Sequence, residues 1–157
     1  MKRSTDEIEA LVEKLSKHGR KDIRWSREQM RALIEADRDG PLHFVNLLGF
    51  FPEAQYPEDH ELSQRNMSGA DAYRLYGAVA LKHVTQRGGR LISLNSAEQT
   101  LLGPEGDWHQ VAVMQYPNTD AFLDMCQDPE YIASLVHRDA GLATTGLIVT
   151  RPLVPAP

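Results

Sequence analysis

Four strand-like segments and two long helical regions follow one another in the order β-α-β-β-α-β, and two amphipathic helices precede them. A split βαβ arrangement has this order, so the sequence predicts an α+β fold. In detail, it predicts a ferredoxin-like sandwich whose four-stranded antiparallel sheet carries both helical regions on one face. The expected segments cover, in chain order, residues 42–48, 69–86, 90–95, 108–116, 119–127 with 129–140, and 144–152.

The first and third strands, which lie at the centre of such a sheet, are nearly continuous apolar runs. They read "HFVNLL" and "QVAVM", a pattern typical of strands that are covered on both faces. The helices of one chain cover only one face. The economical source of the second cover is an identical subunit, so we expect a C2 homodimer whose two sheets enclose a barrel.

Two amphipathic helices are predicted ahead of the first strand, the first over about residues 5–18. Each opens with a serine followed three residues later by Glu or Gln, the capping-box pattern, at Ser4 and at Ser26. Apolar residues recur at helical spacing behind each box, without evident chemistry. We expect residues 1–40 to form a helical extension that pads the core or a subunit interface, and residues 41–157 to form the barrel domain.

Composition excludes several classes of function. The chain has 157 residues, 41% of them hydrophobic, which suits one domain with a real core. Its net charge of −5, with acids and bases interspersed, offers no basic surface for nucleic acid or for a membrane. Cys126 is the single cysteine, so no internal disulfide can form, and we expect a cytoplasmic protein in which this thiol is a small core residue.

Six sequence blocks between residues 42 and 152 resemble the family catalogued as domain of unknown function 1330. The blocks are "FVNLLGF", "SGADAYRLYGAVA", "RGGRLI", "DWHQVAVMQYPNTDAF", "DPEYIASLVHRDAG" and "GLIVTRP". The resemblance implies a dimeric α+β barrel. Similar barrels include cofactor-free monooxygenases, lactone isomerases and small-molecule-binding proteins, so the fold alone does not fix the function. The family often has Lys or Arg after "NLL", where this chain has Gly49.

Asn46 stands out because it is an amide within the apolar first strand. A buried amide costs a few kcal/mol unless its hydrogen bonds are met, so we expect a specific partner. Strand alternation places Asn46 on one face with Phe44 and Leu48. If that face lines the barrel, the amide orients a ligand carbonyl or hydroxyl. If it meets the helices, the amide bonds to backbone.

The helix over residues 69–86 contributes two tyrosines as candidate substrate contacts, Tyr73 and Tyr76. Tyr76 and His83 lie seven residues apart on one stripe, so both lean toward the sheet. A tyrosine hydroxyl near Asn46 would make a polar cluster within an apolar cavity. The plain alternative is a core tyrosine with a solvated hydroxyl, and for His83 we expect an exposed or edge position.

Three further residues are candidates for chemistry. His109 shares its side of the third strand with apolar residues and is a candidate general base, although a hydrogen-bonded structural histidine is the alternative. Trp108 projects to the opposite face and is a candidate substrate contact. Arg138, seven residues after Tyr131, can hold a carboxylate or an enolate, and it also suits the negative end of its helix.

The connection over residues 49–67 shows no regular pattern and has the length of a lid or a flexible loop. Its "EDHE" run lacks metal-ligand spacing, and no phosphate loop or dinucleotide fingerprint is present in the chain, so we expect neither a metal nor a cofactor.

Three functions remain open from the sequence. The first is a small cofactor-independent monooxygenase-like or isomerase-like enzyme that acts on an apolar carbonyl compound. The second is a binding protein with the same pocket and no turnover. The third is a structural dimer that docks a partner protein through its N-terminal helices, which requires their apolar stripes at 8–15 and 30–34 to be exposed.

Overall fold

The computed structural model describes residues 2–155 and contains a single four-stranded antiparallel sheet, in the order β2-β3-β1-β4. The strands are β1 (Leu42–Phe50), β2 (Arg90–Ser96), β3 (Gln110–Tyr116) and β4 (Leu142–Thr150). As predicted, the first and third strands are the central ones. The α+β, ferredoxin-like fold is confirmed.

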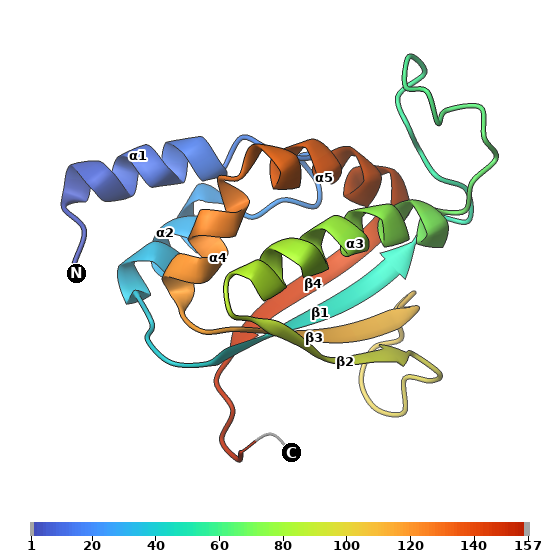
Figure 1. The fold of residues 1–157 in the computed structure, drawn as a ribbon. Helices are drawn as coiled ribbons and strands as arrows, with labels where there is room; N and C mark the ends of the chain where they lie inside the picture. The colour runs from blue at the N-terminus through green and yellow to red at the C-terminus, as the bar shows by residue number, and fades with distance from the viewer. Residues whose placement is uncertain (1, 156–157) are drawn as a thin grey trace.

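Three helices cover one face of the sheet, namely α3 (Gly69–Gln86), α4 (Thr119–Cys126) and α5 (Pro129–Gly141) (Figure 1). The local signals in the sequence fix their starts. The side chain of Ser68 accepts a hydrogen bond from the backbone of Asp71, and that of Asp128 accepts one from Glu130 behind the proline at the first position of α5. Within residues 2–155, no helix is long and apolar enough to cross a bilayer.

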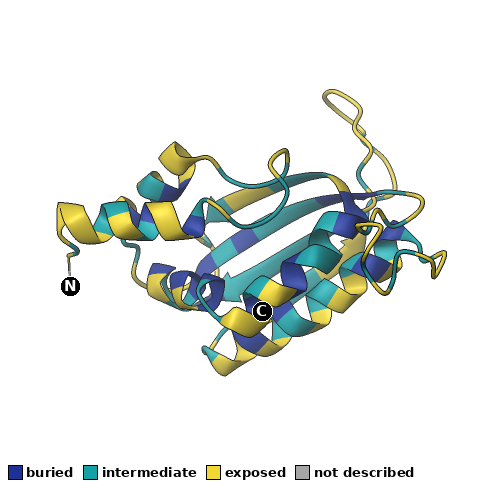
Figure 2. Ribbon diagram, turned by 90° about the horizontal axis from the view of Figure 1, so that it is seen from above, coloured by how far each residue is buried: buried dark blue, intermediate teal, exposed yellow. Residues whose placement is uncertain are grey.

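The two N-terminal helices, α1 (Thr5–Leu15) and α2 (Arg27–Ala36), both begin with the predicted capping box. They lie at one end of the helical layer (Figures 1 and 2) and pack into the same apolar cluster as β1, α4 and α5. Their inward side chains Val12, Leu15, Met30 and Ile34 are each at most 2% exposed. The first helix ends at Leu15, three residues before its predicted end, because Ser16 already leaves the helical conformation.

His83 is buried, at 4% exposure, and the expectation of an exposed or edge position is wrong. Its Nε2 lies 2.6 Å from a carboxylate oxygen of Glu130, and its Nδ1 accepts a hydrogen bond from Arg87 at 3.0 Å. These two charged partners satisfy both ring nitrogens, which removes the cost of burying the imidazole.

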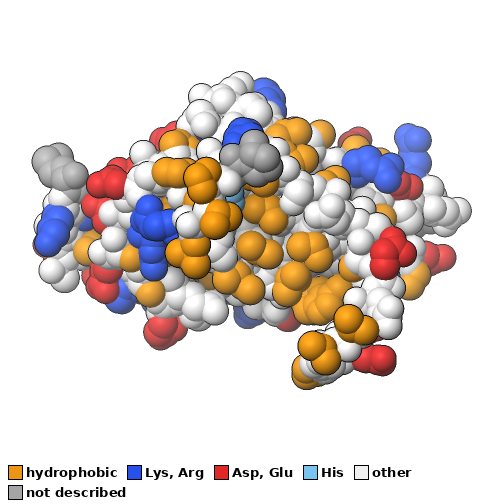
Figure 3. All heavy atoms as spheres, turned by 90° about the horizontal axis from the view of Figure 1, so that it is seen from below, with side chains coloured by type: hydrophobic (Ala, Val, Ile, Leu, Met, Phe, Trp, Pro, Cys, Tyr) orange, Lys and Arg blue, Asp and Glu red, His pale blue; other side chains and the backbone are white. Residues whose placement is uncertain are grey.

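The opposite face of the sheet has no cover from described residues of this chain. Strand pairing places Val45, Leu47, Val111, Val113 and Ile148 together on that face. Figure 3 views the molecule from this side and shows apolar side chains gathered across it. Ile148 is 53% exposed, a large value for an isoleucine on a sheet.

Candidate functional site

A cavity of about 390 Å³ opens between the sheet and the helices that cover it. Its walls come from β1, β3 and β4, from helices α2 to α5, and from the segment that joins α1 to α2. The lining residues are Asp22, Ile23, Arg24, Trp25, Gln29, Met30, Leu33, Phe44, Asn46, Leu48, Tyr73, Tyr76, Tyr116, Phe122, Tyr131, Arg138, Leu142, Thr145, Gly146, Leu147 and Val149. Three of them, Asp22, Gln29 and Leu147, are exposed and mark the mouth.

Packed aromatic rings form the base of the cavity. The ring centroid of Phe44 lies 4.7 Å from that of Tyr116 and 4.7 Å from that of Phe122. Trp25 meets the edge of Phe122 at 6.0 Å. Apolar walls with a few polar groups are the usual composition of a small-molecule site.

Asn46 faces this cavity on the helix-covered side of the sheet. Its Nδ2 donates to the backbone oxygen of Phe44 at 3.1 Å and to that of Ala112 at 3.4 Å. Because both partners are acceptors, only the amide nitrogen can point at them, so the orientation of the side chain is determined. The Oδ1 atom of Asn46 has no hydrogen-bond partner among the described residues and stays available as an acceptor.

Four tyrosines line the cavity, and three of them, Tyr73, Tyr76 and Tyr131, come from helices α3 and α5. The hydroxyls of Tyr76 and Tyr131 lie 2.8 Å apart in a hydrogen bond, and the ring of Tyr73 packs 5.3 Å from that of Tyr76. Burial raises the pKa of each of these phenols above its ordinary value. They are therefore neutral at physiological pH and act as hydrogen-bonding groups, not as bases.

Three charged residues line the cavity, namely Asp22, Arg24 and Arg138, and the side chain of Arg138 is only 12% exposed. Burial acts to lower the pKa of Arg138, but Tyr76, Tyr131 and Asp139 together outweigh that effect. The pKa is therefore raised, and the guanidinium remains positively charged. Its Nε and Nη2 donate to one oxygen of the adjacent Asp139, at 3.3 Å and 3.2 Å. No hydrogen bond between described residues uses its Nη1.

The unused atoms of Arg138 and Asn46 are open to the cavity. Ser16 Oγ is a polar side-chain atom that has neither a hydrogen-bond partner nor contact with solvent. Among the described residues that are not exposed, no other polar side-chain atom lacks both. Arg138 Nη1 and Asn46 Oδ1 have no partner either, so they retain accessible surface. One strong donor and one acceptor thus remain available to an occupant.

The segment that joins α1 to α2 forms one wall, which the sequence did not predict. Arg20 fixes this segment to the end of α5. Its backbone N–H donates to Asp139 at 2.8 Å, and its guanidinium donates to the carbonyl oxygens of Asp139 and Leu142 at 2.6 Å and 2.8 Å. Trp25 Nε1 donates to the carbonyl oxygen of Leu15 at 2.8 Å. The isolated tryptophan and arginines of "GRKDIRW" were the available signal in the sequence.

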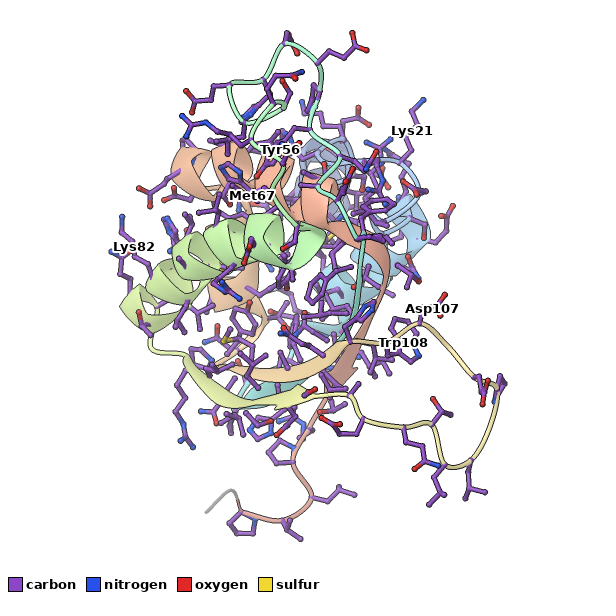
Figure 4. The ribbon with its side chains drawn as sticks, turned by 90° about the vertical axis from the view of Figure 1, so that its right-hand side faces the viewer. Lys21, Tyr56, Met67, Lys82, Asp107 and Trp108 are labelled. Carbon is purple, nitrogen blue, oxygen red and sulfur yellow. The ribbon has the colours of Figure 1, made fainter. Side chains whose placement is uncertain are left out.

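The structure brings Asn46, Tyr73, Tyr76 and Arg138 to one cavity but places His109 and Trp108 outside its lining. His109 is exposed, and its Nδ1 accepts the backbone N–H of Phe50 at 3.0 Å, where the β1–β4 register shifts. This contact matches the structural alternative for His109. Trp108 lies where the 97–109 loop meets β3 (Figure 4) and packs against Gly106 of that loop.

The connection between β1 and α3 lacks regular structure, as predicted, but contributes no residue to the lining of this cavity. Figure 4 labels Tyr56 and Met67 near its base. The Tyr56 hydroxyl is 2.7 Å from Nδ1 of His137 on α5, and the ring of His60 stacks on that of Tyr56 at 4.7 Å. Across residues 2–155, no group of three or more His, Cys, Asp or Glu is arranged to hold a metal ion.

Comparison with solved structures identifies a close structural relative. RPA0582, a protein of unknown function from Rhodopseudomonas palustris, is 32% identical to this chain, with a TM-score of 0.75 over 85% of this chain and 98% of its own. The methylated form of RPA0582 gives 31% identity and a TM-score of 0.76 over 89% and 99%. SnoaB, a cofactor-independent oxygenase from Streptomyces nogalater, is 14% identical, with a TM-score of 0.43 over 74% and 98%.

A family model also matches the chain, over residues 62–152. The match includes α3, α5 and their cavity residues, whereas β1 and the N-terminal helices lie ahead of it. No curated protein matches the chain. With a family match over more than half of its length and a relative of 32% identity across most of both chains, the chain belongs to the family described as domain of unknown function DUF1330.

Proposed function

We propose that the chain binds a small, mainly apolar compound with a carbonyl or hydroxyl oxygen in the cavity on the helix-covered side of the sheet. One observation carries this proposal. Asn46 from β1, Tyr73 and Tyr76 from α3, and Arg138 from α5 surround one aromatic-walled space of about 390 Å³. Polar groups from three different elements that converge on an apolar cavity are typical of a ligand site.

Binding without turnover is the form of this proposal that the geometry favours. Among the described residues no histidine lines the cavity, and burial keeps its four tyrosines neutral. Asp22 is a lining carboxylate, but its hydrogen bond from Arg20 lowers its pKa and makes it a weak base.

An isomerase-like or monooxygenase-like enzyme is the second candidate. It is favoured by the buried charge of Arg138 beside Tyr76, because such a charge stabilises an enolate as it forms. Docking of a partner protein through the N-terminal helices has less support. It requires exposed apolar stripes, whereas Val12, Leu15, Met30 and Ile34 are buried in the core.

A homodimer through the uncovered face of the sheet belongs to the same proposal. The apolar residues Val45, Leu47, Val113 and Ile148 on that face have no cover from described residues of the chain. A second copy presents the same face, so two sheets packed about 10 Å apart would bury both patches. Such a dimer leaves the cavity, which lies on the other side of the sheet, open in each subunit.

The cavity is tested by thermal shift with a panel of small aromatic ketones and phenols. We expect several of them to raise the melting temperature. Leu147→Trp is expected to weaken this effect, because Leu147 lines the mouth and is 42% exposed, so a larger ring fits there and narrows the entrance. Leu94→Trp is the matched control, since Leu94 is 56% exposed and lies outside the lining. No binding by any compound, or equal binding by both variants, contradicts the proposal.

The dimer is tested by sedimentation equilibrium. Ile148→Glu places a charge within the proposed interface and should give a monomer. Because Ile148 is 53% exposed in the single chain, the change costs the monomer little. Leu102→Glu, at a loop residue that is 90% exposed, should leave the dimer intact. A wild-type chain that sediments as a monomer would contradict this part of the proposal.

A further inference from the structure

The polar side of the cavity carries more positive than negative charge. Arg24 and Arg138 both line the cavity and also line a smaller hollow, so the two side chains border the same two spaces. Within residues 2–155, Arg24 forms no ion pair and no side-chain hydrogen bond, whereas Arg20 before it and Arg27 after it both do. Two arginines from different segments therefore meet at one space, and one of them has no acidic partner.

The two aspartates near these arginines, Asp22 and Asp139, already have hydrogen-bond partners. Asp139 receives Arg138 on one carboxylate oxygen and the backbone N–H of Arg20 on the other. Asp22 is paired with the guanidinium of Arg20 at 2.5 Å. This group holds three arginines against two aspartates, which leaves one positive charge without compensation.

The unpaired N–H donors of the two cavity arginines suit a ligand with one negative charge. Arg138 offers Nη1, and the guanidinium of Arg24 has no hydrogen-bond partner in the part of the chain that the structure describes, so both can donate N–H groups to a ligand. A carboxylate has two acceptor oxygens and one negative charge, and guanidinium groups bind it through parallel, charge-assisted hydrogen bonds. A phosphate carries nearly two negative charges at neutral pH and would exceed the single uncompensated charge.

The apolar walls of the cavity indicate the chemistry of the rest of the ligand. Phe44, Tyr116, Phe122 and Trp25 surround the space with ring faces and edges. Such walls suit a ring-bearing body, and Asn46 Oδ1 can accept a hydrogen bond from a hydroxyl on it.

We propose that the ligand is a monocarboxylic acid with an aromatic or similarly apolar body, whose carboxylate binds Arg138 and Arg24. This inference rests on the proposed function, since it assigns a chemical class to the occupant of the same cavity. It implies that the cavity distinguishes an acid from its neutral amide of the same shape.

The test compares matched pairs of acid and amide, such as 2-naphthoate with 2-naphthamide and cinnamate with cinnamamide, by isothermal titration calorimetry on the full chain. We expect each acid to bind at least about tenfold more tightly than its amide. Arg138→Gln should bring this ratio close to one, Arg138→Lys should restore part of it, and Arg24→Gln should reduce it. Arg74→Gln is the control, because Arg74 pairs with Asp71 on the exposed side of α3 and lies outside the cavity.

Each outcome decides a separate point. Equal binding of acids and amides by the wild-type chain overturns the carboxylate inference and leaves the proposed function standing. A preference for the acid that survives both Arg138→Gln and Arg24→Gln also overturns it, because the anion is then held elsewhere. If neither member of any pair binds, the proposed function fails together with the inference.

Discussion

The guanidinium of Arg138 lies close against Gly19, and a single methyl group on this glycine tests how the cavity positions its charge. Gly19 has φ of +86°, a conformation that L side chains rarely adopt, and a Cβ atom built on it would overlap Nη2 of Arg138. The methyl of Gly19→Ala would push the guanidinium away by roughly 1 Å before an ordinary contact is restored. That displacement strains the 3.2 Å hydrogen bond from Nη2 to Asp139.

Gly103 provides the matched control, because the same substitution there adds backbone strain without a clash. Its φ is +89°, and nothing lies within 4 Å of a Cβ built on it. Left-handed alanine costs roughly 1–2 kcal/mol of unfolding free energy at either position. At Gly19 the disturbed pair of Arg138 and Asp139 adds about 1 kcal/mol, for a total of roughly 2–3 kcal/mol.

Chemical denaturation measures the stability of both variants, and calorimetry with 2-naphthoate and 2-naphthamide measures their binding. We expect Gly19→Ala to lose more stability than Gly103→Ala and to lose much of the preference for the acid, whereas Gly103→Ala keeps that preference. Equal stability losses together with an unchanged acid preference in Gly19→Ala would refute the reasoning, because Arg138 would then not depend on this contact for its position.

Three other predictions concern buried or half-buried groups. Tyr131→Phe should lower the free energy of unfolding by about 1–2 kcal/mol, because it leaves the Tyr76 hydroxyl without its partner. The double variant with Tyr76→Phe should lose less unfolding free energy than the two single variants added together, which chemical denaturation measures. Burial raises the pKa of Cys126 to about 12, so a thiol reagent at pH 8 should label the unfolded chain and not the folded one. Burial, with a contribution from His60, lowers the pKa of His137, so its contribution to stability is complete above its ordinary pKa near 6.5 and is lost as the pH falls. His137→Gln should flatten that part of a stability curve measured against pH, and an unchanged slope would contradict the assignment.

The features that the sequence predicted correctly are those with local causes. Ser68 caps α3 and Asp128 caps α5, and each signal lies within four residues of the bond it makes. The central position of β1 and β3 followed from the β-α-β-β-α-β order of the elements, because a ferredoxin-like sheet places its first and third strands at the centre. Asn46, Tyr73, Tyr76 and Arg138 were chosen as polar groups on apolar stripes, and all four line the cavity.

The features that the sequence did not reveal depend on distant contacts. Arg20 shapes the cavity wall through bonds to Asp139, 119 residues away, and His83 is buried because Glu130, 47 residues away, meets its ring. The sequence also did not show which face of the sheet carries Asn46, for a different reason. Alternation assigns residues to a common side of a strand but does not say which side meets the helices when both are apolar.

The wall built by the segment between α1 and α2 has a consequence for how function is distributed within the family. The matched stretch, residues 62–152, contains Arg138 and the tyrosines of α3 and α5, whereas Trp25, Met30 and Asn46 precede it. The matched stretch therefore carries one of the two arginines of the proposed site, whereas the part ahead of it carries Arg24 and much of the apolar wall. A ligand identified for one member cannot simply be assigned to another, because an exchange of the leading segment would alter which molecules fit while Arg138 stays in place.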